Sequence, residues 1–205
     1  MRDLRAVLFD LDGVLIHSYE AWFHLVRLAA RHFCRTDVSA ARFKQSWGQG
    51  LDADLRDFFP GCDAREVERF YEDHLLDFDA HIQVDPEAVT ALRALRDAHI
   101  PRGIVTNTPL YLARDLLAWA GLIGLTDVTS GAVLDVPPKP APDLIVRACQ
   151  ELEVNPRTVL MVGDSRFDAQ AARAAGTEYV GYRTDESPAV SKLSDVVDLV
   201  LPKGP

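Results

Sequence analysis

The stretch AVLFDLDGVL, from Ala6 to Leu15, decides the fold. An apolar run short enough for a buried strand is followed at once by Asp10 and Asp12, and then by Gly13. Side chains alternate along a strand, so the two carboxylates point the same way if the strand continues through Leu11. In an open parallel sheet, ligands bind outside the carboxyl ends of the strands. The stretch therefore predicts a strand that presents two carboxylates at a binding edge.

Two carboxylates at the end of a buried strand are costly unless a cation or a proton donor accounts for them. A hard cation such as Mg²⁺ would do so, together with a reaction that uses one carboxylate as a nucleophile and the other as an acid. The alternative is a plain turn, in which Gly13 only supplies a positive φ. The spacing of the two aspartates leaves both interpretations open.

The rest of the chain shows which kind of sheet this strand joins. Short apolar runs alternate with amphipathic segments, a pattern typical of a parallel sheet flanked by helices. Strands are expected at 6–10, 102–106, 126–130, 158–162, 177–181 and 196–200, and helices at 85–98, 109–120, 142–152 and 165–175. We therefore predict an α/β fold with a Rossmann-like parallel sheet core.

One long segment breaks the alternation. Residues 16–83 show helical periodicity at Ala21–Phe33, Ala41–Trp47 and Ala64–Phe78, and no convincing strand. We interpret this segment as an inserted all-helical cap domain, which leaves residues 1–15 and 84–205 as the catalytic core.

A second acidic pair follows a later strand. In LMVGDSRFDAQAARAAG, from Leu160 to Gly176, Asp164 ends the apolar run and Asp168 lies one turn into the next helix, facing back. Asp and Ser are also ordinary residues at a helix N-terminus, so a purely local role is the alternative. Two acidic strand ends in one sheet would repel each other, and a shared divalent metal ion resolves that repulsion.

Two further residues complete a candidate phosphate site. Thr106 ends the strand RGIVT, so its hydroxyl and the backbone N–H groups after it are placed to bind an anion at a helix start. Lys139 lies in PPKPAPD, where prolines stiffen the backbone. Alone, each has an ordinary interpretation, as a helix-start residue and as a solvated lysine. Their order along the chain, together with the acidic pairs, favours a joint site.

The segments FDLDGVL, VTNTP, PPKPAPD and VGDSRFDAQAARAAG resemble the four motifs of the haloacid dehalogenase superfamily, most closely its phosphoglycolate phosphatase-like branch with a helical cap. The resemblance spans nearly the whole core, and it covers the cap only by position and helical character. It implies a Mg²⁺-dependent phosphatase that acts on a small phosphorylated metabolite, phosphoglycolate-like or a sugar phosphate. The dehalogenases of the superfamily lack an aspartate at the position of Asp12.

The resemblance also implies a role for each residue. Asp10 would be the nucleophile that becomes an aspartyl-phosphate, and Asp12 the general acid and then the base that activates water. Thr106 would hold a phosphoryl oxygen with Asn107 nearby, and Lys139 would neutralise charge and orient Asp10. The implied Mg²⁺ ligands are Asp10, the backbone carbonyl of Asp12 and Asp164, with Asp168 assisting.

Specificity is expected from the cap loop KQSWGQGLD, Lys44–Asp52, where Trp47 would either contact substrate or pack into the cap. Two positions depart from phosphoglycolate phosphatases. His17 replaces the usual acidic residue after the first motif, and it would touch substrate or fill space. Thr108 stands where those enzymes carry a lysine, which puts phosphoglycolate itself in doubt as the substrate.

The composition and charge of the chain argue against several other classes of protein. The chain has 205 residues and a net charge of −9, and it shows no basic block, no membrane-length apolar stretch, no signal-peptide core and no CxxC pair. We expect a cytoplasmic monomer or weak homodimer that binds neither nucleic acid nor membrane. The alternatives kept open are a sugar-phosphate mutase resembling β-phosphoglucomutase, a pyrophosphatase or nucleotidase on the same scaffold, and a non-catalytic binding protein.

Overall fold

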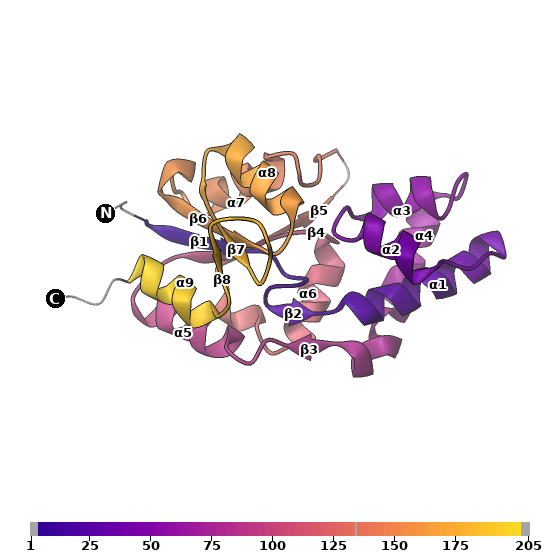
Figure 1. The fold of residues 1–205 in the computed structure, drawn as a ribbon, viewed down its shortest axis with the longest axis horizontal. Coiled ribbons are helices and arrows are strands. Elements are labelled where there is room, and N and C mark those ends of the chain that lie inside the picture. The colour runs from indigo at the N-terminus through magenta and orange to yellow at the C-terminus, as the bar shows by residue number, and fades with distance from the viewer. Residues whose placement is uncertain (1–3, 134, 202–205) are drawn as a thin grey trace.

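The computed structural model describes residues 4–133 and 135–201. They form a six-stranded sheet with helices on both faces, and a helical segment extends from one end (Figure 1). The strand order is β5-β4-β1-β6-β7-β8, and each neighbouring pair is parallel. The strands are β1 (Ala6–Phe9), β4 (Arg102–Pro109), β5 (Val128–Ala132), β6 (Val159–Gly163), β7 (Glu178–Tyr182) and β8 (Ala189–Val190). The predicted α/β fold is confirmed.

Strand β1 is apolar throughout because it is covered on both faces. Val7 and Phe9 belong to one hydrophobic cluster, with buried side chains of α5 (Ala88–Asp97), α6 (Leu110–Trp119) and α9 (Leu193–Val200). Ala6 and Leu8 point to the other face and belong to a second cluster, with α7 (Asp143–Glu151) and α8 (Arg166–Ala175). The alternation of side chains along one strand therefore divides the core into two layers.

The strand order places a binding crevice at the end of β1. The chain builds β4 and β5 on one side of β1 and then returns to build β6, β7 and β8 on the other side. Phe9 is thus paired with Ile104 of β4 and with Val162 of β6. Connections that leave in opposite directions open a crevice outside the carboxyl ends of the strands. Asp10 follows β1 at this point.

The segment between β1 and β4 is mostly helical. It contains α1 (Tyr19–Cys34), α2 (Ala40–Ser46), α3 (Leu51–Asp57), α4 (Ala64–His74) and the 3₁₀ helix η1 (Leu75–His81), which lie together at the right of Figure 1. The expectation of a segment without strands is wrong, because β2 (Ile16–His17) pairs antiparallel with β3 (Gln83–Val84) at its base. Strands of two residues are too short to show an alternating pattern in the sequence. The cap boundaries at 16 and 83 stay a prediction.

The predicted strand at 196–200 is also wrong, because these residues belong to helix α9. Leu193, Val196 and Val200 are buried at helical spacing, and the helix packs against α5. The run VVDLV was misleading because β-branched residues favour strands only where tertiary packing agrees. The other predicted strands and helices of the core are present, and short 3₁₀ helices η2 (Ile123–Leu125) and η3 (Pro156–Thr158) lie between them.

A buried carboxylate ties the base of the helical segment to the sheet. Asp85, which follows β3, accepts a hydrogen bond of 2.6 Å from the Tyr182 hydroxyl of β7 and one of 3.0 Å from the Glu87 backbone N–H. The same carboxylate lies 3.1 Å from His17 Nε2 of β2 and 3.4 Å from an Arg183 guanidinium nitrogen. The contact with Asp85 gives His17 a structural role at the junction.

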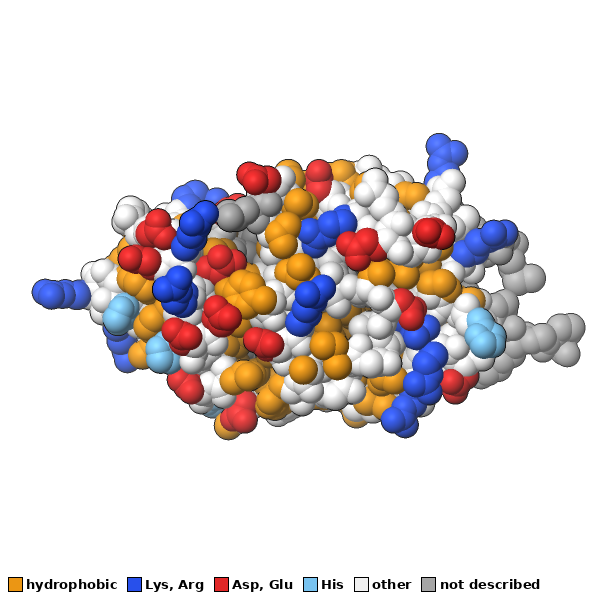
Figure 2. Space-filling model, turned by 180° about the vertical axis from the view of Figure 1, so that it is seen from behind, with side chains coloured by type: hydrophobic (Ala, Val, Ile, Leu, Met, Phe, Trp, Pro, Cys, Tyr) orange, Lys and Arg blue, Asp and Glu red, His pale blue; other side chains and the backbone are white. Residues whose placement is uncertain are grey.

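We found no helix among the described residues long and apolar enough to span a membrane. On the face shown in Figure 2, acidic and basic side chains are interspersed rather than gathered into blocks of one sign.

Replacing Asp85 with alanine should destabilise the fold by about 2–3 kcal/mol, since the buried Tyr182 hydroxyl loses its acceptor. Chemical denaturation would measure the change. Asp97→Ala, which removes an exposed carboxylate paired only with its neighbour Arg96, is the control and should change stability by less than about 0.5 kcal/mol. Equal effects of the two substitutions would contradict the role of this junction.

Candidate active site

Asp10 lies where β1 ends, and the sheet fixes its position. Its backbone N–H donates to the Val162 carbonyl of β6 at 2.8 Å. Its buried side chain accepts two bonds on Oδ1, from the Leu11 backbone N–H at 2.7 Å and from the Lys139 ammonium at 3.0 Å. Among the described residues, no donor reaches Oδ2. One carboxylate oxygen is therefore anchored, and the other remains available for chemistry.

Lys139 is buried, and all three of its ammonium protons have an acceptor. Nζ lies 3.0 Å from Asp10 Oδ1, 2.6 Å from Asp168 Oδ1 and 2.9 Å from the Val105 carbonyl of β4. Burial alone would lower the pKa of Lys139, but the two carboxylates outweigh it and raise that pKa above its ordinary value. Lys139 is thus a fixed positive charge that joins the first motif to the fourth.

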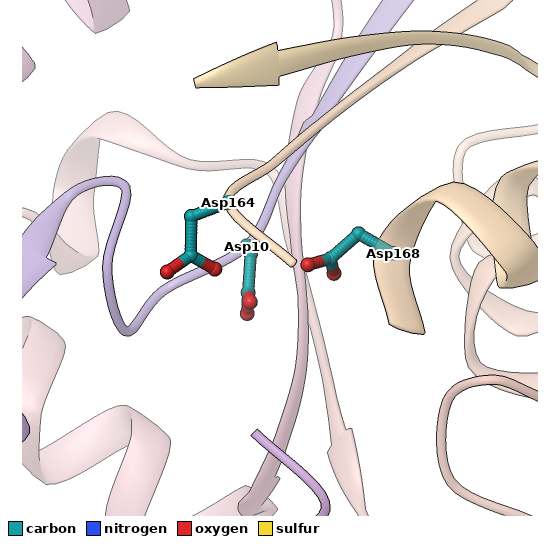
Figure 3. Close-up of side chains that lie close together, drawn as sticks. All are labelled: Asp10, Asp164 and Asp168. Atoms are coloured by element: carbon teal, nitrogen blue, oxygen red, sulfur yellow. The ribbon is translucent and has the colours of Figure 1, made fainter. Parts of the chain in front are cut away.

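Three carboxylates from two strand ends meet at this point. Asp164 follows β6 and Asp168 lies in the first turn of α8, and in Figure 3 both carboxylates point toward that of Asp10. One oxygen of each lies within 4.8 Å of the others, so the three could hold a metal ion. Asp168 is held in a capping box: its Oδ2 accepts from the Ser165 hydroxyl at 2.6 Å and from the Ser165 backbone N–H at 3.1 Å.

Two glycines make this close approach feasible. Gly13 has φ +89°, and a Cβ built there would lie 2.1 Å from Asp164 Oδ2. A Cβ on Gly163 would lie 2.2 Å from the Asp168 Cβ. Any side chain at either position would displace a carboxylate of the cluster. The glycine of the first motif is therefore required by both its backbone conformation and its neighbour.

The site holds more negative charge than it neutralises. Burial, opposed by Lys139 and reinforced by Asp168, raises the pKa of Asp10 well above its ordinary value. Burial and the neighbouring Asp168 likewise raise the pKa of Asp164 to about 7. One lysine thus does not offset the cluster, and an added cation would stabilise the ionised carboxylates.

The Asp12 side chain is held by three donors. Its Oδ1 accepts hydrogen bonds from the Ser18 hydroxyl and, at 3.0 Å, from Trp22 Nε1 of α1. Its Oδ2 accepts from the Thr108 hydroxyl at 2.7 Å. Sequence reasoning missed Ser18 and Trp22, although their i, i+4 spacing at the start of a helix puts them on one face. It treated Thr108 only as the loss of a lysine.

A pocket lies over this site and is lined by Asp10, Lys139 and Asp164 together with residues of the helical segment. Thr106 and Asn107 are both buried in its wall, but their side chains differ in what they can do. The Thr106 hydroxyl accepts from the Thr108 backbone N–H at 3.1 Å and keeps its own proton for a ligand. Asn107 is saturated by backbone groups: its Nδ2 donates to the carbonyls of Gly48 and Lys139, and its Oδ1 accepts from the Lys139 N–H. Asn107 therefore positions Lys139 and the cap loop.

The cap loop reaches the pocket, and Trp47 packs within the helical segment while it also lines the pocket. The loop between α2 and α3 is shorter than expected, covering residues 47–50. The Trp47 ring packs edge-on against Tyr19, with centroids 5.1 Å apart, and the residue also lines the pocket.

One acidic residue of the pocket was not foreseen, because the expected cap loop ended at Asp52 and no helix was predicted over the residues that follow it. Asp54 of α3 accepts a hydrogen bond of 2.9 Å from the Tyr71 hydroxyl on Oδ2 and one of 3.4 Å from the Ser46 hydroxyl on Oδ1. Burial raises its pKa to about 7, despite these two donors. Nothing in the spacing of LDADLRD marks this aspartate as different from its neighbours.

In this site a buried carboxylate is paired with a lysine, and the acidic cluster beside it is suited to a cation. Both lie at the point where the strand order of a parallel sheet reverses. This arrangement defines an enzyme that acts on anionic substrates. A model of the haloacid dehalogenase-like hydrolase family matches residues 4–176. The chain belongs to this family, as its resemblance to the four motifs predicted, and it is a phosphatase.

Curated relatives agree with this assignment. The chain is 32% identical to the phosphoglycolate phosphatase of Xylella fastidiosa (strain 9a5c) over 203 residues, 94% of this chain and 88% of the relative. It is 30% identical to the N-acetylmuramic acid 6-phosphate phosphatase of Pseudomonas putida over 190 residues, 88% of this chain and 83% of the relative. A mutant of CbbY from Rhodobacter sphaeroides, solved with xylulose-(1,5)bisphosphate, shares the fold with a TM-score of 0.83 at 18% identity, over 94% of this chain and 96% of that one.

The raised pKa of Asp54 makes the folded state less stable as the pH rises. A carboxyl group whose pKa is higher in the folded state stabilises the fold while it is protonated, and this contribution is lost as pH rises from about 4 to about 7. Asp54→Asn removes the ionisation and keeps an acceptor for Tyr71. Relative to the wild type, the variant should gain about 2–3 kcal/mol of unfolding free energy between pH 5 and pH 8. Asp52→Asn, on an exposed position of the same helix, is the control.

Denaturant unfolding of the three proteins at several pH values would measure this. A difference between Asp54→Asn and the wild type that stays constant from pH 5 to pH 8 would contradict the burial of the Asp54 charge.

Proposed function

We propose that this phosphatase hydrolyses phosphoric monoesters with Mg²⁺, through an aspartyl-phosphate on Asp10. One observation carries the proposal: inside an acidic cluster, Asp10 has one oxygen anchored by Lys139 and the backbone, while its other oxygen has no donor within the described part of the chain. A carboxylate held in this way is oriented for attack, and the cations around it allow an anionic phosphoryl group to approach.

The donor set fits a hard divalent cation. Asp10, Asp164 and Asp168 offer oxygen ligands only, which is the preference of Mg²⁺. Burial, reinforced by the neighbouring carboxylates, raises the pKa of Asp10 and of Asp164, so a bound cation would stabilise their ionised forms. The Asp12 side chain is engaged elsewhere, so its contribution would be the backbone carbonyl. Mg²⁺ would neutralise charge on the phosphoryl oxygens and hold the phosphoryl group against Asp10.

In the first step, a carboxylate oxygen of Asp10 bonds to phosphorus, and the bond between phosphorus and the ester oxygen breaks. Asp12 gives its proton to the departing oxygen, which leaves as an alcohol. Thr106 donates its hydroxyl proton to a phosphoryl oxygen, and Lys139 offsets the charge that gathers at the transferred group.

In the second step, water attacks phosphorus and Asp12 takes the proton it releases. The bond between Asp10 and phosphorus then breaks, phosphate leaves, and both aspartates return to their starting states. The three donors on Asp12 keep its carboxyl group in one place for both proton transfers. Ser18, Trp22 and Thr108 are accordingly positioning residues.

Asp10→Asn should lower phosphate release from a small phosphoric monoester by roughly 10⁴-fold or more, because the amide cannot form the intermediate. The variant should fold, because Lys139 keeps its bonds to Asp168 and to the Val105 carbonyl and the amide oxygen of asparagine can still accept from it. Steady-state phosphate release with and without Mg²⁺ measures the activity of the variant. A thermal melt shows whether it is folded. Asp97→Asn, far from the site, should retain full activity. Substantial turnover by folded Asp10→Asn would refute the mechanism.

A further inference from the structure

The half of the pocket that the helical segment builds, opposite the acidic cluster of the sheet, is the part left to contact a leaving group. It is lined by aromatic and aliphatic side chains and by one carboxylate, and all of them come from the helical segment: Trp22, Phe43, Ser46, Trp47, Leu51, Asp54 and Tyr71. Lys139 is the cationic side chain among the described lining residues, and its three protons already have acceptors. Nothing in this half of the pocket could neutralise an anionic leaving group.

Asp54 is fixed as part of this wall. Its two oxygens accept from the Tyr71 hydroxyl at 2.9 Å and the Ser46 hydroxyl at 3.4 Å, so three different helices hold it in place. Both partners are hydroxyl groups, and neither carries a positive charge. A carboxylate oxygen accepts more than one hydrogen bond, so Asp54 keeps capacity for a donor supplied by the substrate.

Carboxyl groups outnumber cationic side chains in the described lining of the pocket. Four carboxyl groups line it, those of Asp10, Asp12, Asp54 and Asp164, against the single ammonium of Lys139, and three remain to carry charge while Asp12 holds the proton that it donates. The metal ion and the phosphoryl group carry opposite charges of similar size, so they leave this excess unchanged. A leaving group that brings a further negative charge next to Asp54 is repelled in a confined site, whereas a positive one is attracted.

The aromatic residues beside Asp54 add to this preference. The Trp22 and Tyr71 rings lie edge to face with centroids 5.6 Å apart, and both line the pocket. Aromatic faces attract ammonium groups and gain nothing comparable from carboxylates. Because Trp22 Nε1 also donates to Asp12, the aromatic wall is continuous with the group that protonates the leaving oxygen.

We propose that Asp54 selects the leaving group: the preferred substrates are phosphoric monoesters whose alcohol carries a protonated amine, which pairs with the Asp54 carboxylate. This inference rests on the phosphatase function proposed above. Amino-alcohol or amino-sugar phosphates should therefore be better substrates than phosphoglycolate, whose carboxylate would be repelled by a carboxylate of the protein.

Three esters of the same length separate the end groups: ethanolamine phosphate, 2-hydroxyethyl phosphate and phosphoglycolate. At pH 8 with Mg²⁺, where Asp54 is ionised, the wild type should show kcat/KM values in the order ammonium, hydroxyl, carboxylate, with at least about tenfold between the first and the last. Asp54→Asn should lower kcat/KM for ethanolamine phosphate and raise it for phosphoglycolate. Asp52→Asn is the matched control and should keep the wild-type order.

The wild-type comparison tests the inference even if the variant fails to fold. Highest kcat/KM for the hydroxyl or the carboxylate ester would overturn it, and so would an order that folded Asp54→Asn leaves unchanged. Hydrolysis of p-nitrophenyl phosphate, which needs Mg²⁺ and Asp10, reports separately on the proposed function. If p-nitrophenyl phosphate is cleaved but the three esters do not follow the expected order of kcat/KM, only the proposed role of Asp54 is refuted. If none of the four esters is cleaved, both proposals fall.

Discussion

The buried ammonium of Lys139 is the interaction on which the rest of the site depends. It bonds to Asp10 at the end of β1, to Asp168 in α8 and to the Val105 carbonyl of β4. Without it, carboxylates from two neighbouring strand ends would share a buried space with no positive charge of the protein between them. One lysine, carried on a loop that Asn107 holds through its backbone, thus joins three motifs that lie far apart in the sequence.

The core of this arrangement could be predicted from the sequence because its signals are local. An apolar run followed by Asp10, and another followed by Asp164, mark strand ends, and a parallel sheet brings such ends to one edge. The contacts of Lys139 could not be derived from local pattern, because PPKPAPD lies in a loop whose path is set by tertiary packing. The resemblance to known motifs supplied that expectation, and the structure shows the contact with Asp10.

The failures of prediction lie where local pattern and tertiary context differ. Residues 196–200 have strand propensity, but their apolar side chains cover α5 at helical spacing. Helix α3 has only seven residues, so its pattern was too short to predict a helix beyond the expected loop, and Asp54 was overlooked. The character of Asp54 arises from its burial beside Tyr71, which lies 17 residues further along the chain. Substrate selection is therefore the property that the sequence alone reveals least.

The central claim is that Asp10 forms a covalent bond to the phosphoryl group. Beryllium fluoride binds to a carboxylate oxygen and imitates an aspartyl-phosphate, and ¹⁹F NMR distinguishes bound from free fluoride complexes. The account predicts a bound signal for the wild type with Mg²⁺, its retention in Asp12→Asn, and its loss in folded Asp10→Asn. A bound signal that persists in Asp10→Asn, or that never forms in the wild type, would contradict the assignment of Asp10 as the nucleophile.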